Sequence, residues 1–438
     1  MINLDPILIG IGGFLLFLAL LLTTGLPIGI GMALVGFLGI WALRGPEVAL
    51  SVLYQIPYGA IASWLLSVLP MFVLMGYVAF YAGFAKDAYD AAYRWVGRLP
   101  GGLAVATLIG AALFGACSGS SVAATATLGK LAFPEMERYN YDRRLAAGTV
   151  AMGGTLDALI PPSILLVLYG VVTEQNISEL LIAGILPGIL SMAVFIVLVV
   201  IRALINPKLA PKGDRFSWKE RVAGLKGVIG IGVIFLSVIG GLYTGTFTPT
   251  EAGAVGAFVM FILGFAMKRL DWKIIRQIIS DSLTVYSSIF LIILGAYIFV
   301  RFMALTRLPV VFAEWVVALP VSPMAVFGGI VIAYLILGCF MDAIGLLLLT
   351  VPFIFIPMRT LGFDLVWFGI MVVKLLEIGL LAPPLGIQTY VLKSVAPSLS
   401  LKDIVLGFLP FVIVDLFIVM GLLTLFPKIA TYLPSMMH

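Results

Sequence analysis

Hydroxyl groups interrupt a long apolar stretch of this chain at Ser118-Gly119-Ser120-Ser121. In a membrane, hydroxyls and freed backbone carbonyls at such a break can coordinate a small cation, and the half-helix that follows presents a positive dipole end to an anion. The alternative is a helix-packing patch, because Gly and Ser commonly pack membrane helices together. Three serines and a glycine in four positions exceed what packing needs. We therefore predict a cation site formed by these four residues.

A second break contains Gly153, Gly154 and Thr155, followed by Asp157 and then by Pro161-Pro162-Ser163. Glycine and proline at this density exclude a continuous helix. The backbone carbonyls that an unwound segment frees need partners, and a cation or a substrate can supply them. A simple proline kink is the alternative, and it leaves unexplained why a similar break occurs later in the chain.

The later break runs from Glu377 through Gly379 to Pro383-Pro384, and Gln388 follows it. Leu381-Ala382-Pro383-Pro384 repeats Leu159-Ile160-Pro161-Pro162 at a distance of 222 positions. The same shift carries Pro27 to Pro249, Cys117 to Cys339 and Asp142 to Asp364, and a shift of 223 carries Gly184, Leu186 and Pro187 to Gly407, Leu409 and Pro410. Two interrupted apolar segments at matching places in two halves indicate a transporter whose binding site lies where the halves meet.

Ionisable side chains within apolar segments are candidates for function by default. Asp157 lies in the first break, and Asp342 follows Met341 in an apolar stretch of the second half. Of the two aspartates, Asp342 is the better carboxylate ligand for a cation. Its apolar stretch has no serine cluster that could neutralise a cation in its place. Lys374 and Glu377 lie three residues apart on one predicted helix, a spacing that favours an internal ion pair.

Composition identifies a membrane protein. The 438 residues are 62% hydrophobic and 11% charged, with a mean hydropathy of +1.19, whereas soluble domains are about a quarter charged. The two cysteines provide no disulfide framework. The single histidine, His438, is the last residue, which argues against histidine-ligated metal and histidine proton relays within the membrane. The basic residues lie between spans, which is not a nucleic-acid signature, and the N-terminus has no positive region typical of a cleaved signal.

The apolar runs predict an all-α polytopic fold of about ten transmembrane helices and two re-entrant helical hairpins, at 103–133 and 325–357. Residues 1–201 form one repeat, which includes an unwound helix at 146–170. Residues 202–226 are a polar cytoplasmic linker, and 227–438 form the second repeat, with its unwound helix at 366–392. The predicted spans lie near 6–23, 27–43, 64–83, 146–170, 181–201, 228–243, 250–267, 281–300, 366–392 and 404–426.

Five crossings in each half require the second half to be inverted relative to the first. The distribution of positive charge tests this independently, since cytoplasmic loops carry an excess of Lys and Arg. With the N-terminus outside, 20 of the 26 Lys and Arg residues fall in inside loops and five fall outside. Both termini are therefore predicted to be periplasmic. Within the inside loops, residues 268–276 are typical of a short interfacial helix.

The segments 115–123, 153–163, 183–188, 340–345 and 377–386 together resemble the large membrane subunit of tripartite ATP-independent periplasmic (TRAP) transporters, the DctM type. The resemblance covers essentially the full length. It implies a sodium-driven importer of small organic acids in the bacterial inner membrane, with an elevator-type movement, a fold like that of the ion transporter superfamily, and no cofactor besides sodium ions. Its implied partners are a separate four-helix Q (DctQ-type) subunit and a periplasmic substrate-binding protein, the P subunit.

The resemblance also assigns residues. Its sodium sites fall on Ser118, Ser120 and the Gly154 region, and on the Asp342 and Gly379 region. Together with the analysis above, this gives the predicted ion-binding set Ser118, Gly119, Ser120, Ser121, Gly154, Thr155, Asp157, Met341, Asp342 and Gly379. The substrate is expected between Pro161-Pro162-Ser163 and Pro383-Pro384, with Gln388 nearby. The chain departs from the family at Ala124, where some relatives are acidic, and at Lys374, where a neutral polar residue is expected.

Two other interpretations are compatible with parts of the pattern. A stand-alone dicarboxylate or citrate carrier of related fold would need no periplasmic protein. A membrane-embedded enzyme would need clustered His, Asp or Glu on facing helices, and a single terminal histidine argues against it. The chain contains no P-loop, so it does not hydrolyse ATP by that motif.

Alanine substitution of Ser118, Ser120 or Asp342 tests the predicted ion site. Each change removes an oxygen ligand, so we expect the sodium concentration for half-maximal uptake to rise while expression is maintained. Uptake measured across a sodium series checks this, and an unchanged sodium dependence would remove that residue from the site.

Overall fold

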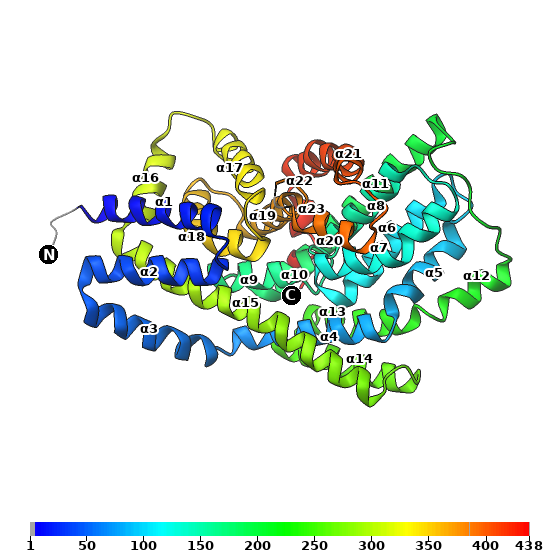
Figure 1. Ribbon diagram of the computed structural model, residues 1–438, viewed down its shortest axis with the longest axis horizontal. Helices are drawn as coiled ribbons and strands as arrows, with labels where there is room; N and C mark the ends of the chain where they lie inside the picture. Colours follow the sequence, from blue (N-terminus) through cyan, green and yellow to red (C-terminus); the bar gives the residue numbers. More distant parts are fainter. Residues whose placement is uncertain (1–4, 385, 438) are drawn as a thin grey trace.

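The computed structural model describes residues 5–384 and 386–437, and every regular element in that part of the chain is helical. The molecule is elongated, with long helices running along its length (Figure 1). This confirms the predicted all-α membrane fold. Six helices are long and apolar enough to cross a membrane, or up to eight if each bent pair counts as one span, by length and composition alone and among the described residues. The ten predicted spans also count Ile28–Arg44 and the two unwound helices, and they leave out Ala343–Thr360, which belongs to the predicted hairpin at 325–357.

The first half contains eleven α-helices and one short 3-10 turn. The predicted hairpin is a pair of antiparallel helices, α6 and α7, and the predicted unwound helix is divided into α8 and α9. The elements are α1 (Pro6–Thr24), α2 (Ile28–Arg44), α3 (Pro46–Ile61), η1 (Leu65–Ser67), α4 (Val68–Tyr81), α5 (Phe84–Val96), α6 (Gly102–Ser118), α7 (Ser121–Arg138), α8 (Arg143–Leu156), α9 (Ile164–Thr173), α10 (Ile177–Ala183) and α11 (Ile185–Ile205).

The linker contains α12 (Trp218–Leu225), and the second half repeats the order of the first. Its hairpin is α17 and α18, and its divided helix is α19 and α20. The elements are α13 (Ile229–Tyr243), α14 (Pro249–Ala266), α15 (Trp272–Thr306), α16 (Leu308–Ala318), α17 (Pro323–Gly338), α18 (Ala343–Thr360), α19 (Leu365–Gly379), α20 (Ile387–Val395), α21 (Leu401–Val414), the π-helical turn η2 (Asp415–Val419), α22 (Met420–Leu425), α23 (Lys428–Thr431) and η3 (Pro434–Met436).

The two halves correspond at their hairpins and divided helices. Helices α7 and α18 both have 18 residues, and they begin 222 positions apart, at Ser121 and Ala343. Asp142 and Asp364, also 222 apart, cap α8 and α19 by accepting backbone N–H groups at 3.0 and 2.8 Å. The spacing seen in the sequence is therefore a spacing of equivalent structural positions. The opposite orientation of the halves stays a prediction from charge.

Helix α15 differs from its counterpart in the first half. It is one helix of 35 residues, whereas α3 and the η1–α4 segment are bent by 59° at their junction. The short interfacial helix predicted at 268–276 is wrong, because Trp272 onward belongs to α15. Asp271 caps this helix at Ile274, and the residues that follow contain no glycine or proline before Gly295 to end it. Helices α3, α5 and α16 were not predicted as separate elements.

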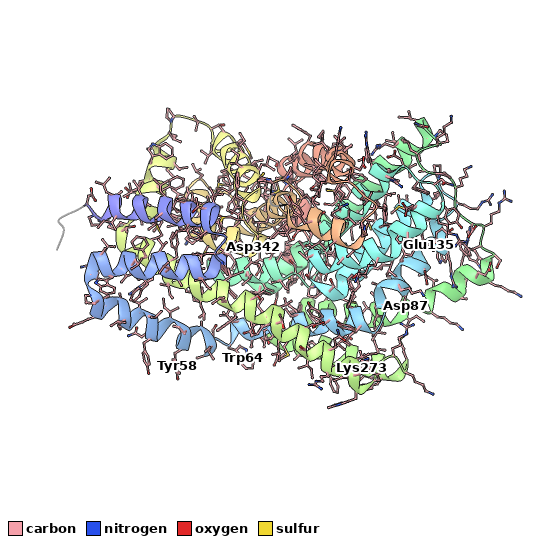
Figure 2. The ribbon with its side chains drawn as sticks, in the orientation of Figure 1. Tyr58, Trp64, Asp87, Glu135, Lys273 and Asp342 are labelled. Carbon is pink, nitrogen blue, oxygen red and sulfur yellow. The ribbon has the colours of Figure 1, made fainter. Side chains whose placement is uncertain are left out.

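Loops that were predicted to share the cytoplasmic side lie near one another. Asp87, Glu135 and Lys273 are all found toward the right-hand end of the molecule in Figure 2. Arg269 forms an ion pair with Asp87, which joins the segment before α15 to α5. The linker packs on the same end, since Trp95 of α5 stacks edge-on against Trp218 of α12 at 5.5 Å.

Glycines allow close helix crossings at several places. A Cβ atom added at Gly148 of α8 would overlap the carbonyl oxygen of Gly407 in α21. In the second half, a Cβ atom on Gly338 of α17 would lie 2.6 Å from the Cα atom of Gly379 in α19. Small residues let helix backbones approach in this way within a bilayer. The first crossing holds a divided helix against α21, and the second holds a hairpin helix against a divided helix.

Replacing Gly148 by alanine is expected to lower stability by about 1–3 kcal/mol, because the backbones of α8 and α21 must separate. The measurement is the midpoint of thermal unfolding of the purified protein in detergent. Gly232→Ala is the matched control, since a Cβ atom there meets nothing within 4 Å. Equal midpoints for the two variants would contradict the close crossing.

Candidate functional site

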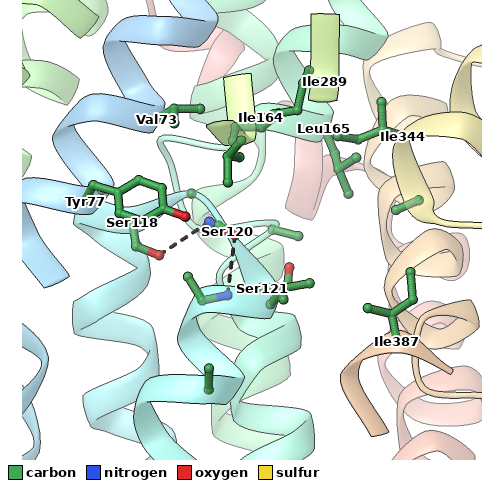
Figure 3. A pocket seen from close by; sticks show the side chains of 18 of the residues that line it. Val73, Tyr77, Ser118, Ser120, Ser121, Ile164, Leu165, Ile289, Ile344 and Ile387 are labelled. Atoms are coloured by element: carbon green, nitrogen blue, oxygen red, sulfur yellow. Dashed lines mark hydrogen bonds between the residues drawn. The ribbon is translucent and has the colours of Figure 1, made fainter. Parts of the chain in front are cut away.

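The serine cluster forms the tip of the first hairpin. Helix α6 ends at Ser118, Gly119 adopts a left-handed φ of 64°, and Ser120 caps α7 by accepting the N–H of Ala123. A positive φ is favourable for glycine and costly for residues with a side chain, so glycine suits the turn. Figure 3 shows Ser118, Ser120 and Ser121 gathered at this tip. The hydroxyls therefore lie at a helix break, as the sequence predicted.

Asp157 binds the tip from the first divided helix. Its side chain is fully buried, and the Ser118 hydroxyl donates to its Oδ2 atom at 2.5 Å. Its Oδ1 atom is buried and has no hydrogen-bond partner among the described residues. A buried carboxylate oxygen without a donor is costly. This oxygen can therefore act as a ligand for a cation, and the residues here fit a sodium ion.

Gly154 and Thr155 lie beside the same hairpin. A Cβ atom on Gly154 would overlap the hydroxyl of Thr125 in α7 and would lie 3.0 Å from the carbonyl oxygen of Ser121. The Thr155 hydroxyl donates to the carbonyl of Met152 in its own helix. The unwound end of α8 is thus packed directly against the hairpin tip, with its backbone close to that of Ser121.

The proline pairs differ in their surroundings. Pro161, Pro162 and Ser163 are buried, and the Pro162 carbonyl oxygen lies 2.7 Å from where a Cβ atom on Gly119 would be. Ser163 caps α9 by accepting the N–H of Leu166. In the second half, Pro383-Pro384 is exposed. The peptide bond within each pair is cis.

Glu377 joins the second half to the first hairpin. The hydroxyl of Ser121 donates to Glu377 Oε1 at 2.7 Å, and Gln388 Nε2 donates to Oε2 at 3.0 Å. The Glu377 and Gln388 side chains are 3% and 0% exposed. Gln388, predicted near the substrate, therefore holds a carboxylate instead of facing open space.

Asp342 lies at the tip of the second hairpin. It caps α18 by accepting the N–H groups of Ile344 and Gly345, both at 3.0 Å, and it is found in the middle part of the molecule (Figure 2). Met341 beside it is buried, and Gly379 packs against Gly338 behind the tip. Asp342→Ala would also remove this cap, so Asp342→Asn, which retains an oxygen acceptor, is the cleaner variant.

Both hairpin tips line one cavity of about 500 Å³ (Figure 3). Ser118 to Ser121 come from the first tip, Asp342 to Ile344 from the second, and Glu377 from the second divided helix. Asp281 of α15 also lines it and accepts a hydrogen bond from Tyr81 at 2.5 Å. Among its described lining residues the cavity has three carboxylates and no lysine or arginine. This surface favours cations.

The cavity brings together only part of the predicted set. It contains the four residues of the first tip and Asp342, while Gly154, Thr155, Asp157, Met341 and Gly379 lie outside its lining. Neither proline pair lines it, and the substrate position between them stays a prediction. Sequence reasoning missed Asp281 and its partner Tyr81. Asp281 is the first residue of the predicted span 281–300. Because an ionisable residue inside a membrane span is a candidate for function, its position is the signal that could have identified it.

The predicted ion pair between Lys374 and Glu377 is wrong. Lys374 Nζ lies 2.8 Å from Asp415 Oδ1 and donates to the Ser191 hydroxyl at 2.9 Å. Glu377 is bound by Ser121 and Gln388 instead. The spacing of three residues placed the two side chains on neighbouring helix positions, but partners on other helices determine where each one points.

No group of three or more His, Cys, Asp or Glu side chains arranged to hold a metal ion is found among the described residues. Two hairpins and two divided helices lie around one cavity in a multi-span helical protein, an arrangement typical of membrane transporters. The fold is similar to that of the YdaH transporter of Alcanivorax borkumensis, with a TM-score of 0.59, 12% identity and 89% of each chain covered. It is also similar to MtrF of Neisseria gonorrhoeae, with a TM-score of 0.53, 13% identity, and 91% of this chain and 84% of that chain covered.

Residues 15–429 match the family of the tripartite ATP-independent periplasmic transporter, DctM component. The chain belongs to this family of TRAP transporter large permeases, as its motifs indicated. It is 33% identical to the C4-dicarboxylate permease DctM of Pseudomonas aeruginosa over 84% of this chain and 85% of that protein. It is 31% identical to the sialic acid permease SiaM of Vibrio cholerae over 95% and 96%, and 32% identical to the 2,3-diketo-L-gulonate permease YiaN of Escherichia coli over 91% and 94%.

Ser121→Ala is expected to destabilise the protein by about 1–3 kcal/mol, because it leaves a buried Glu377 oxygen without its donor. Thermal unfolding in detergent measures this. Ser237→Ala is the control, since that hydroxyl donates only to Val233 within its own helix. In a Glu377→Gln background the effect of Ser121→Ala should shrink, and an undiminished effect would show that the contact is not what stabilises this region.

Proposed function

We propose that this chain carries out sodium-coupled uptake of a small organic acid across the bacterial inner membrane. It would act as the large membrane subunit of a three-part system. Sodium ions would bind at the hairpin tips, and no other cofactor would be needed. The chain would use the sodium gradient and the membrane potential, which supplies about 2.3 kcal/mol per elementary charge per 100 mV.

The charge of the cavity is the observation that carries this proposal. Asp281, Asp342 and Glu377 line it, and its described lining includes no basic side chain. An anion placed among carboxylates in a medium of low dielectric is strongly disfavoured unless cations accompany it. An organic acid could therefore bind here only together with cations, and this physical requirement is a basis for symport.

The first sodium ion would lie near Asp157. The free Oδ1 atom of this buried carboxylate, the Ser118 hydroxyl and the backbone beside Gly119 supply oxygen atoms at the hairpin tip. The second would lie near Asp342 and the crossing of Gly338 with Gly379. Both tips belong to hairpins, which can move with their bound ions as one body.

The relatives support an organic acid as the substrate class. The printed names of three of them specify C4-dicarboxylate, sialic acid and 2,3-diketo-L-gulonate. These compounds differ in size, and their common feature is an acid group. We infer that this chain provides a site for a carboxylate and that a periplasmic binding protein performs the first selection of the substrate.

The partners would be a four-helix Q subunit and a periplasmic P subunit. Family membership supports a tripartite system, and one relative, of Oleidesulfovibrio alaskensis, is named an isethionate TRAP permease DctMQ. We propose that both termini of this chain are periplasmic, because that orientation leaves 20 of 26 basic residues in the cytoplasm.

Transport would follow an elevator-type movement of the hairpins and divided helices against the remaining helices. Helices α2, α4, α14 and α15 form one layer, with α15 crossing α2 at Gly29 and Gly295 (Figure 1). The cavity lies between this layer and the hairpins, since Val73, Tyr77 and Ile289 line it opposite the two tips. Such a boundary between two bodies suits a sliding movement.

Reconstitution of the chain with its Q subunit in proteoliposomes, with and without the binding protein, tests the function. We expect uptake of a labelled organic acid only with an inward sodium gradient and only with the loaded binding protein. Replacing sodium by potassium at equal ionic strength is the control. Uptake by this chain alone would favour the stand-alone carrier, and uptake unaffected by sodium would contradict the coupling.

A further inference from the structure

A buried ion pair lies away from the cavity in the second half of the chain. Lys374 of α19 contacts Asp415 at 2.8 Å and the Ser191 hydroxyl at 2.9 Å. The Lys374 and Asp415 side chains are each 4% exposed. Asp415 begins the π-helical turn between α21 and α22, and Ser191 belongs to α11. One lysine therefore joins three helices.

Lys374 lies close to the cavity carboxylate Glu377. The two residues are three positions apart on α19, and side chains at this spacing are neighbours on a helix surface. A lysine has a long flexible stem, so a different rotamer can bring its ammonium group toward Glu377. In the structure the lysine points to Asp415 instead, and Glu377 accepts hydrogen bonds from Ser121 and Gln388. Two carboxylates thus lie within reach of one cation.

The first half of the chain provides an internal comparison. Lys374 corresponds to Met152 at the shift of 222, and Asp415 corresponds to Met192 at the shift of 223 that relates Pro187 to Pro410. The equivalent positions of the first half therefore carry two methionines, Met152 buried and Met192 partly buried, where the second half has an ion pair. Packing of this architecture does not require the pair, and replacing a buried pair by apolar side chains of similar volume is often neutral for stability.

We propose that Asp415 is a positioning residue that holds Lys374 away from Glu377 and so preserves the negative charge of the cavity for the coupling cation. Ser191 assists, because its hydroxyl accepts from Lys374 while it donates to the Pro187 carbonyl of its own helix at 2.8 Å. Without Asp415, the ammonium group would turn to the remaining carboxylate and occupy it as a tethered cation. This role rests on the sodium-coupled uptake proposed above.

Asp415→Asn is the direct test, because it removes the charge and keeps the shape. We expect the sodium concentration for half-maximal uptake to rise about tenfold, since an ammonium group at Glu377 cancels part of the negative charge that attracts sodium to the cavity. The double variant Lys374→Met with Asp415→Met copies the first half and removes the competing cation. We expect it to restore the sodium dependence to within about twofold of the unchanged chain.

Recovery in the double variant distinguishes positioning from a structural role. If Asp415→Asn and the double variant lose uptake equally, transport requires the ion pair as such, and the proposal is wrong. If Asp415→Asn transports with unchanged sodium dependence, the proposal is also wrong. Size-exclusion profiles in detergent report whether each variant folds.

Ser191→Ala is the second test variant, to be used if Asp415→Asn does not fold. This variant removes one anchor of Lys374 and should raise the sodium requirement about twofold, with no effect in the double-methionine background. An equal rise in the sodium requirement when Ser191→Ala is made in the unchanged chain and in the double-methionine variant would contradict the proposed positioning of Lys374. If the unchanged chain transports without sodium, the proposed function fails. The positioning role is then judged from the uptake rate, which should fall in Asp415→Asn and recover in the double variant.

Discussion

A helix that breaks inside a bilayer leaves polar backbone groups that lipid cannot satisfy. This constraint governs the two hairpin turns and the two divided helices, because all four of these breaks contribute residues to the lining of one cavity. A side-chain hydrogen bond from Ser118 to Asp157 links the hairpin turn at Gly119 to the end of α8. The hairpin turn at Asp342 is satisfied by its own capping bonds. The unwound end of α19 is linked to the first hairpin through Ser121 and Glu377.

The breaks also concentrate charge. Carboxylates at positions that lipid would exclude are buried against hydroxyls and amides, and the cavity between the tips has no described basic side chain in its lining. Lys374, which lies three positions from Glu377 on α19, is directed to Asp415 on another helix. Under the proposed function, cation binding, anion transport and the placement of this lysine would be aspects of a single electrostatic arrangement, in which buried negative charge is left for a mobile ion to neutralise.

The two halves share their helix order but not their chemistry. The first tip offers a serine cluster and a buried aspartate behind it, whereas the second tip offers an aspartate that caps its own helix. Asp157 corresponds to Gly379 at the shift of 222. In the first half a carboxylate lies against Gly115, and in the second half two glycine backbones touch, Gly338 and Gly379. Equivalent positions thus hold a buried carboxylate in one half and a close helix crossing in the other.

The sequence by itself determined the membrane class, the repeat, both hairpins, both divided helices and the family, because hydropathy, glycine and proline act locally and leave a pattern along the chain. Serine, glycine and aspartate at the first tip were predictable for the same reason. Only the tertiary structure decided the partners. Glu377 meets Ser121 across 256 positions, Lys374 meets Asp415 instead of its helical neighbour, and Asp281 reaches the cavity from α15. Rotamer choice among buried charges depends on which helices pack together, and that information lies in contacts between distant segments.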